Sequence, residues 1–140
     1  MAYHFGYVYI MYYEREETGE QLHKFGVSNT PSTRHKQVNR ALLGDVYLQA
    51  EFPVFSPYIM ESAVKKWLKA YKQEPLDAGP GAGKNEFYNL PSGKLFMLYL
   101  WCIFKAFLIW STPFTLIFIT LLATGRAEYI VYAVVQYLHN

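Results

Sequence analysis

The chain has 140 residues, of which 13 are Lys or Arg and 11 are Asp or Glu, so its formal net charge at pH 7 is +2. This length allows one ordinary domain, or a small domain with an appendage. The single cysteine, Cys102, excludes a disulfide framework and a cysteine-rich zinc site. Residues 1–94 hold 11 of the 13 basic and 10 of the 11 acidic residues, so the two parts of the chain differ in kind.

Residues 5–28 are expected to form a β-hairpin. The stretch 5–13, FGYVYIMYY, is aromatic and β-branched, which is typical of a strand. The charged segment 14–21 contains Gly19 and predicts the turn, and LHKFGVS at 22–28 predicts the partner strand. The N-terminus lacks a basic region followed by a long apolar run, so it does not predict a secretory signal, and we expect this domain in the cytoplasm.

A helix is expected over roughly 31–43. Thr30 is suited to cap it, Pro31 to occupy its first position, and Gly44 to end it. Alternating apolar and polar residues at 46–55 then predict a third strand, ending at Pro53.

A second helix is expected over about 57–73, opened by Pro57 and carrying one apolar stripe. The Gly/Pro-rich segment at 75–85 lacks the GxxxxGK[ST] spacing of a phosphate loop, so we interpret it as a flexible loop. EFYNL at 86–90 predicts a short final strand. The order ββαβα(β) predicts an α+β domain over residues 1–92.

Residues 93–140 are expected to form a hydrophobic tail associated with a membrane. The apolar run Leu95–Ala123 is 29 residues long, interrupted only by Lys105 and by Pro113 after Ser111 and Thr112. This exceeds the roughly 20 residues that a helix needs to span a bilayer. Three alternatives stay open: a single crossing at about 106–123, a helical hairpin at about 94–111 and 113–138, and a helix pair buried in a larger globular core.

The first domain carries an ordered set of motifs. GYVYI at 6–10 is followed by Lys24-Phe25-Gly26 about fifteen residues later, and Arg34 lies eight residues after Gly26. Glu61 follows on the second predicted helix, in YIMESAVKKWL. This arrangement resembles the GIY-YIG nuclease superfamily over roughly residues 5–90, in particular its phage-related branch with a KIG-type second motif.

The resemblance implies Mg²⁺- or Mn²⁺-dependent cleavage of DNA phosphodiester bonds. It implies that Tyr9 is the base or the group that orients the attacking water, that Arg34 clamps the phosphate, and that Glu61 is the metal ligand. Such residue types suit this chemistry, because a guanidinium fork matches phosphate and one carboxylate can share Mg²⁺ with phosphate and water. Secondary candidates are Lys24, His35 and, for the family's late asparagine, Asn89 in preference to Asn85 or Gln73.

Each residue also has a purely structural interpretation. Tyr9 would then pack within its strand, Arg34 would be solvated, and Glu61 with Lys65 would form an i,i+4 surface ion pair. Four lysines on the second predicted helix are suited to follow a DNA backbone, and they would otherwise form a solvated face: Lys65, Lys66, Lys69 and Lys72.

We therefore expect a membrane-tethered endonuclease with a cytoplasmic N-terminal domain, whose partners are DNA and membrane lipid. GIY-YIG relatives cut alone or as dimers, so homo-oligomerisation stays open. The rival hypothesis is a catalytically inactive, membrane-anchored module that binds nucleic acid or protein, since Lys24 replaces the second-motif tyrosine and Val27 follows the glycine. A third hypothesis is a purely structural small membrane protein.

Overall fold

The computed structural model of the chain describes residues 5–76, 78–79, 86–124 and 136. The chain divides into two compact units, Met1–Ala106 and Phe107–Asn140. The first unit is an α+β domain, as expected from the sequence, and its last helix continues into the second unit.

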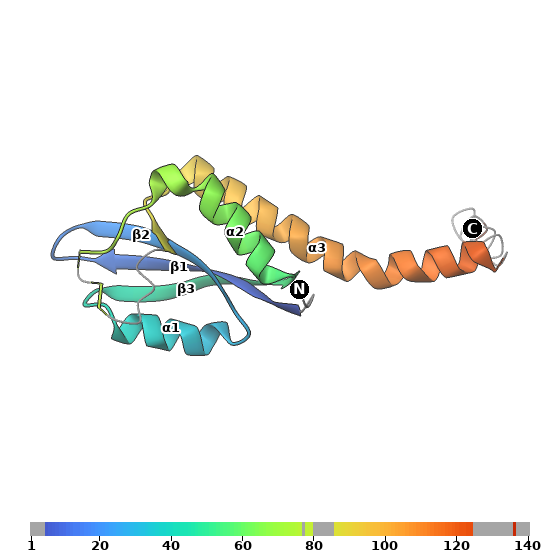
Figure 1. Cartoon of the computed structure of the whole chain (residues 1–140), viewed down its shortest axis with the longest axis horizontal. Coiled ribbons are helices and arrows are strands. Elements are labelled where there is room, and N and C mark those ends of the chain that lie inside the picture. The colour runs from blue at the N-terminus through green and yellow to red at the C-terminus, as the bar shows by residue number, and fades with distance from the viewer. Residues whose placement is uncertain (1–4, 77, 80–85, 125–135, 137–140) are drawn as a thin grey trace. The chain divides into compact units, whose positions relative to one another are not determined.

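A four-stranded antiparallel sheet with the order β3-β1-β2-β4 forms the centre of the first unit (Figure 1). The predicted hairpin is confirmed as β1 (Phe5–Arg15) and β2 (Glu20–Ser28). Gly19 ends the turn between them with a φ of 65°, a conformation that suits glycine. β3 (Asp45–Phe55) continues past Pro53, which an edge strand tolerates.

The last strand is very short. β4 (Phe87–Tyr88) confirms the predicted final strand, and it pairs only with His23 and Lys24 of β2. The following part of β2, residues 25–28, therefore has no β4 partner, and this stretch of the sheet edge borders the candidate site.

The two faces of the sheet have different covers. α1 (Pro31–Arg40) packs on one face, where Val38 joins a buried cluster that includes Tyr9, Met11, Tyr13 and Phe87. α2 (Pro57–Trp67) and the start of α3 cover the other face (Figure 1). Because side chains alternate along a strand, Val8 and Ile10 point to this second face, and both are fully buried.

Both predicted helices of the domain end earlier than expected. α1 ends at Arg40, and Leu42 then turns into the buried cluster. α2 ends at Trp67 and is followed by the 3-10 helix η1 (Lys69–Tyr71). The chain leaves the helix because it pairs with the last strand: the Asn89 amide donates to the Tyr71 carbonyl, and Lys72 bridges to Tyr88.

Of the three alternatives for the tail, the helical hairpin is wrong in the position of its turn. α3 runs without interruption from Ser92 to Ala123 and contains Pro113. The hydroxyls of Ser111 and Thr112 donate back to the Leu108 carbonyl, one turn earlier in the helix, at 3.0 and 2.7 Å. The remainder of the expected returning segment, residues 125–135 and 137–140, lies outside the described residues.

α3 is long and apolar enough to cross a membrane, by its length and composition. Its first turns belong to the first unit, where Leu98 and Cys102 are fully buried and Tyr99 contacts Gln49 and Phe52. From Phe107 onward its side chains are mostly exposed.

Candidate functional site

Tyr9 and Gly26 are direct partners in the pairing of β1 with β2. A Cβ atom placed on Gly26 would lie 2.7 Å from Cζ of Tyr9, closer than real Cβ contacts. The phenol ring therefore lies across the glycine, and only the missing side chain at position 26 leaves room for it. This contact joins the first and second motifs of the predicted set in one physical unit.

The buried phenol of Tyr9 lies within the electrostatic reach of the other predicted residues. Burial, the carboxylate of Glu86 and that of Glu61 raise its pKa to about 12, although a hydrogen bond and the positive charge of Arg34 act in the opposite direction. Arg34 from α1 is thus close enough to hydrogen-bond the phenol, whereas Glu61 from α2 acts on it only through its charge, more weakly than Glu86 does. The phenol is neutral at physiological pH, so it can donate a hydrogen bond.

Lys24 is a fully buried lysine next to this group. Its Nζ lies 2.5 Å from Oε2 of Glu86 and 4.8 Å from the centre of the Phe87 ring. Burial lowers the pKa of Lys24, and the charge and hydrogen bond of Glu86 partly offset this effect. A buried ammonium group is unfavourable without a counter-ion, so Glu86 stabilises the charged form of Lys24.

Glu86 also connects Lys24 to the metal-ligand candidate. Nζ of Lys65 lies 3.4 Å from Oε1 of Glu86 and 3.2 Å from Oε1 of Glu61. The i,i+4 pair of Glu61 and Lys65 is therefore present in the structure, but it is one link of a longer chain of alternating charges: Lys24, Glu86, Lys65 and Glu61.

Two other predicted residues make their hydrogen bonds elsewhere. Nε2 of His35 lies 2.6 Å from the carbonyl oxygen of Val46 and fastens α1 to β3. The side-chain amide of Asn89 donates to Gln73 at 3.3 Å on the exposed surface. These contacts give both residues a structural role and do not join them to Tyr9, Arg34 or Glu61.

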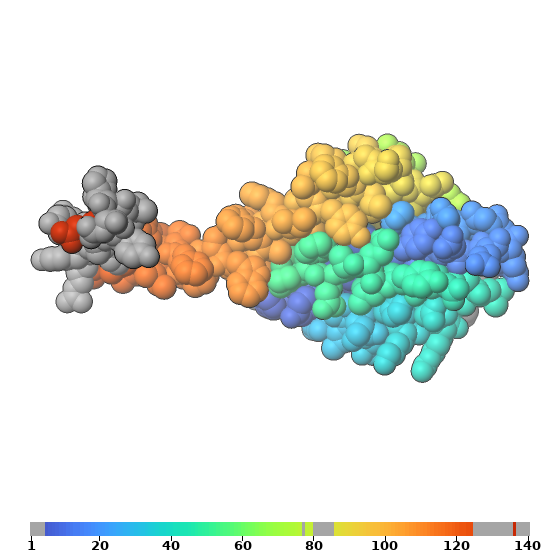
Figure 2. Space-filling model, turned by 180° about the vertical axis from the view of Figure 1, so that it is seen from behind, coloured from blue at the N-terminus to red at the C-terminus, as the bar shows by residue number. Residues whose placement is uncertain are grey.

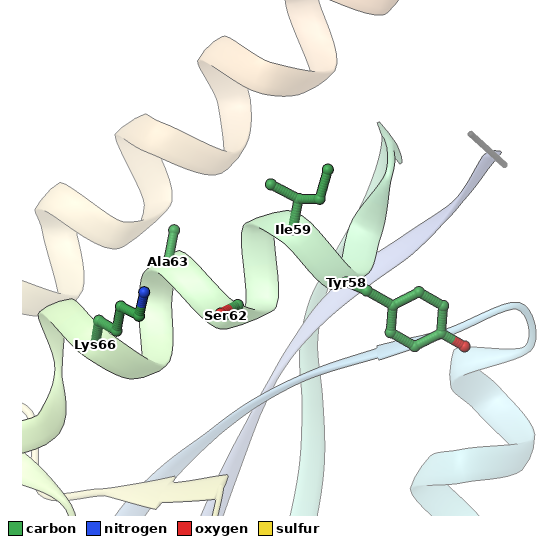
Figure 3. Close-up of a pocket in the computed structure, with 5 residues that line it drawn as sticks. All are labelled: Tyr58, Ile59, Ser62, Ala63 and Lys66. Carbon is green, nitrogen blue, oxygen red and sulfur yellow. The ribbon is translucent and has the colours of Figure 1, made fainter. Parts of the chain in front are cut away.

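The four predicted lysines do not share one helix. Only Lys65 and Lys66 belong to α2, because Lys69 lies in η1 and Lys72 follows it. Lys65 is held by two carboxylates, and Lys72 lies 4.0 Å from Glu74. Lys66 borders a shallow groove on α2 (Figure 3). The expectation of a single lysine face on one helix is therefore wrong.

Sequence reasoning missed Glu86 and Tyr88. Glu86 is 62 positions from Lys24, and no local spacing connects the two residues. Lys24 itself indicated that an acidic partner must exist, because a charged side chain in the middle of an apolar strand requires a counter-ion. Tyr88 is also buried, and burial followed by the charges of Glu86 and Glu61 raises its pKa to about 12.

The donor set at the site suits a metal that is shared with a substrate. Glu61 is 14% exposed and offers a carboxylate. Magnesium is commonly held by one or two carboxylates together with waters and phosphate oxygens. Across the described residues, no three or more His, Cys, Asp or Glu side chains form a group able to hold a metal ion. The site therefore fits such a shared ion and does not fit a structural metal enclosed by protein ligands.

No known protein family matches this chain, and neither a curated protein nor a solved structure matches it. Any functional assignment therefore depends on the chemistry of these residues and on the sequence resemblance already described.

Proposed function

We propose that this protein is a membrane-tethered, metal-dependent endonuclease of the GIY-YIG kind. The observation that supports this proposal most strongly is the placement of the Tyr9 phenol, which crosses Gly26, is hydrogen-bonded by Arg34 and lies within reach of the Glu61 charge. These residues are far apart in the sequence and come from three elements.

The residues divide the chemistry among them. Arg34 presents a planar guanidinium that can hold a phosphate through two parallel hydrogen bonds. Glu61 would hold Mg²⁺ or Mn²⁺, which supplies charge stabilisation to the phosphate and to the leaving oxygen. Lys65 would shift toward Glu86 when Glu61 takes up a cation, because it already contacts both carboxylates.

Tyr9 and Lys24 are suited to different roles. The raised pKa of Tyr9 keeps its phenol protonated, so Tyr9 is suited to orient the attacking water rather than to remove its proton. Lys24 is fully buried and its ammonium is paired with Glu86, so it is suited to position Glu86 beside the site. We therefore assign the orienting role to Tyr9 and a positioning role to Lys24.

The tail gives this activity a location. α3 would anchor the protein in the membrane with its first unit in the cytoplasm, so that it cuts DNA close to the bilayer. A role in defence, or in phage exclusion, follows as a hypothesis from the combination of the two units. Labelled DNA injected into cells that contain the protein should be degraded on entry, and intact entry would contradict that role.

The test of the activity is a plasmid-nicking assay with the full chain in detergent. We expect nicking with Mg²⁺ or Mn²⁺, none with EDTA, and loss of nicking in Glu61→Ala. Glu16→Ala, an exposed change in the β1–β2 turn, is the matched control and should cut normally.

A second candidate function is an inactive binding module. It is favoured by the ammonium group of Lys65, which already neutralises Glu61, and by Lys24 in place of a second-motif tyrosine. In that case Arg34→Ala and Glu61→Ala should leave partner binding unchanged, whereas a nuclease should lose its activity in both variants while staying folded.

A further inference from the structure

The outer surface of the first unit carries large apolar side chains on two neighbouring helices. Figure 2 shows the first turns of α3, in yellow and orange, at this surface. We define the α2–α3 face by two residues of α2 and four of α3: Ile59, Trp67, Met97, Leu100, Trp101 and Phe104. Ile59, Met97 and Phe104 are each more than half exposed, with 57%, 53% and 56% of their surface accessible.

Two shallow grooves mark this face. One of about 450 Å³ lies along α2 and is lined by Tyr58, Ile59, Ser62, Ala63 and Lys66. In Figure 3, Ile59, Ala63 and Lys66 point to the side of α2 on which α3 runs. The other groove, of about 390 Å³, lies between the helices and is lined by Trp67, Met97 and Trp101. Both grooves are bordered mainly by apolar atoms.

Water is a poor solvent for the α3 part of this face. Leu98 and Cys102, four residues apart, point into the first unit and are fully buried. The outward side of a helix in a soluble domain is normally polar. Here the outward positions are apolar, and residues 95–104 contain no charged side chain. This side of α3 therefore needs an apolar or amphipathic cover.

The length of α3 favours a bilayer as that cover. At 1.5 Å per residue, the apolar run Leu95–Ala123 is about 44 Å long. A bilayer is about 30 Å thick in its hydrocarbon core and roughly 40–45 Å with its headgroup layers. Ala106–Ala123, which has no charged residue, is then about 27 Å long and nearly matches the core, and the preceding turns reach the headgroup layer. A partner protein would cover one side of the helix. Beyond Phe107 the side chains of α3 are exposed on several sides, which a bilayer covers and a single partner does not.

The chemistry around the α2–α3 face is that of a membrane interface. Tryptophan and lysine are enriched at the headgroup level. Nζ of Lys94 lies 5.2 Å from the ring of Trp67, whose ring in turn meets that of Trp101 edge to face. Lys66 and Lys105 add positive charge, and α3 contains no acidic residue. Basic residues near a membrane surface are attracted to anionic lipids.

We infer that the α2–α3 face binds the headgroup layer of an anionic bilayer, while the rest of α3 occupies the hydrocarbon core. The first unit then contacts the membrane surface through its own side chains. This inference rests on the membrane insertion included in the proposed function, and it is independent of nuclease chemistry.

The experiment uses tryptophan quenching in the full chain, reconstituted in vesicles of phosphatidylcholine and phosphatidylglycerol that contain brominated lipids. Trp110→Phe leaves Trp67 and Trp101 as reporters of the face. The double variant Trp67→Phe/Trp101→Phe leaves Trp110 as reporter of the inserted helix. We expect bromines near the headgroups to quench the first variant most, and bromines deeper in the chains to quench the second most.

Two charge variants complete the test. Leu100→Glu, made in the Trp110→Phe background, should reduce quenching of the face by about half or more. Ser32→Glu, which adds the same charge on the exposed start of α1, should leave it unchanged. Circular dichroism and the thermal midpoint check that both variants are folded.

The outcomes are distinct. If only Trp110 is quenched, α3 inserts but the face stands off the membrane, and the inference is overturned while the tether survives. If neither reporter is quenched, both the inference and the proposed tether fail. An unquenched face with disulfide cross-linking of Phe104→Cys, in a Cys102→Ser background, would assign the face to a second copy of the chain and overturn lipid binding.

Discussion

The ring of Tyr9 lies across Gly26, its direct partner on the neighbouring strand. This contact explains why a glycine stands at a buried strand position, where glycine is otherwise unfavourable. It also brings an aromatic residue from β1 across β2, where Arg34 hydrogen-bonds its phenol and the Glu61 charge acts on it. The proposed site depends on this crossing.

Gly26→Ala should destabilise the first unit and displace the phenol. The new Cβ would lie 2.7 Å from Cζ of Tyr9, and overpacking of a buried site typically costs about 1–3 kcal/mol. Thermal or urea unfolding of the full chain in detergent measures this change. Gly93→Ala is the control, because no atom lies within 4 Å of its added Cβ. Equal stability of the two variants would contradict the placement of the Tyr9 ring.

Removal of the Glu86 carboxylate should be one of the more damaging changes in the domain. Glu86→Ala leaves the fully buried ammonium of Lys24 without its counter-ion, and breaking a buried ion pair in this way costs about 3–5 kcal/mol. The double variant Lys24→Met/Glu86→Ala should recover part of that loss, because no charge is then left buried.

The exposed pair of Arg15 and Glu17 provides the comparison for this prediction. Glu17→Ala should change stability by no more than about 1 kcal/mol, since exposed ion pairs contribute little. A loss in Glu86→Ala as small as that in Glu17→Ala would show that Lys24 does not depend on Glu86.

The sequence could predict the parts of the structure that depend on neighbouring residues. Periodicity and turn residues predicted β1, β2 and the start of α1 and α2, because these features are local. The end of α2 could not be predicted, since it is set by the pairing of Tyr71 and Lys72 with β4. Glu86 was missed for the same reason, because its partners lie on distant elements.

The tail shows the opposite error. Ser-Thr-Pro at 111–113 resembles a turn in a soluble protein, and this led to the hairpin as one of the alternatives. In the structure the helix continues through Pro113, and the hydroxyls of Ser111 and Thr112 bond back to the Leu108 carbonyl within the helix. In the site, Tyr9, Lys24, Arg34 and Glu61 were predicted and lie near one another, whereas His35 and Asn89 make their contacts elsewhere.

Alkaline pH should destabilise the domain through two buried tyrosines. The pKa values of Tyr9 and Tyr88 are raised to about 12, above an unfolded value of about 10. A raised pKa means that the stability they contribute is complete below about pH 10 and is lost as the pH rises to about 12. In a spectrophotometric titration, Tyr9→Phe and Tyr88→Phe should each remove one tyrosinate from the late part of the curve, near pH 12. A late part of the curve unchanged by Tyr9→Phe would contradict this environment.

Lys65 should compete with the metal for Glu61. Lys65→Met removes the ammonium that lies 3.2 Å from the Glu61 carboxylate, so less Mg²⁺ should be needed for half-maximal nicking. Lys69→Met, a change in the exposed η1 segment, is the control and should leave the metal requirement unchanged. A higher Mg²⁺ requirement in Lys65→Met would instead mean that Lys65 helps to assemble the site.

The central claim is that Tyr9, Arg34 and Glu61 form one phosphodiester-cleaving site. The most direct measurement is the nicking rate of the full chain with saturating Mg²⁺, compared with Tyr9→Phe, Arg34→Ala and Glu61→Ala, each first shown to be folded. We expect each variant to lose about 100-fold or more of the nicking rate, because each substitution removes a group that stabilises the transition state. Nicking that persists in all three variants, or its absence from the folded wild-type chain with every divalent metal and DNA substrate, would contradict the account.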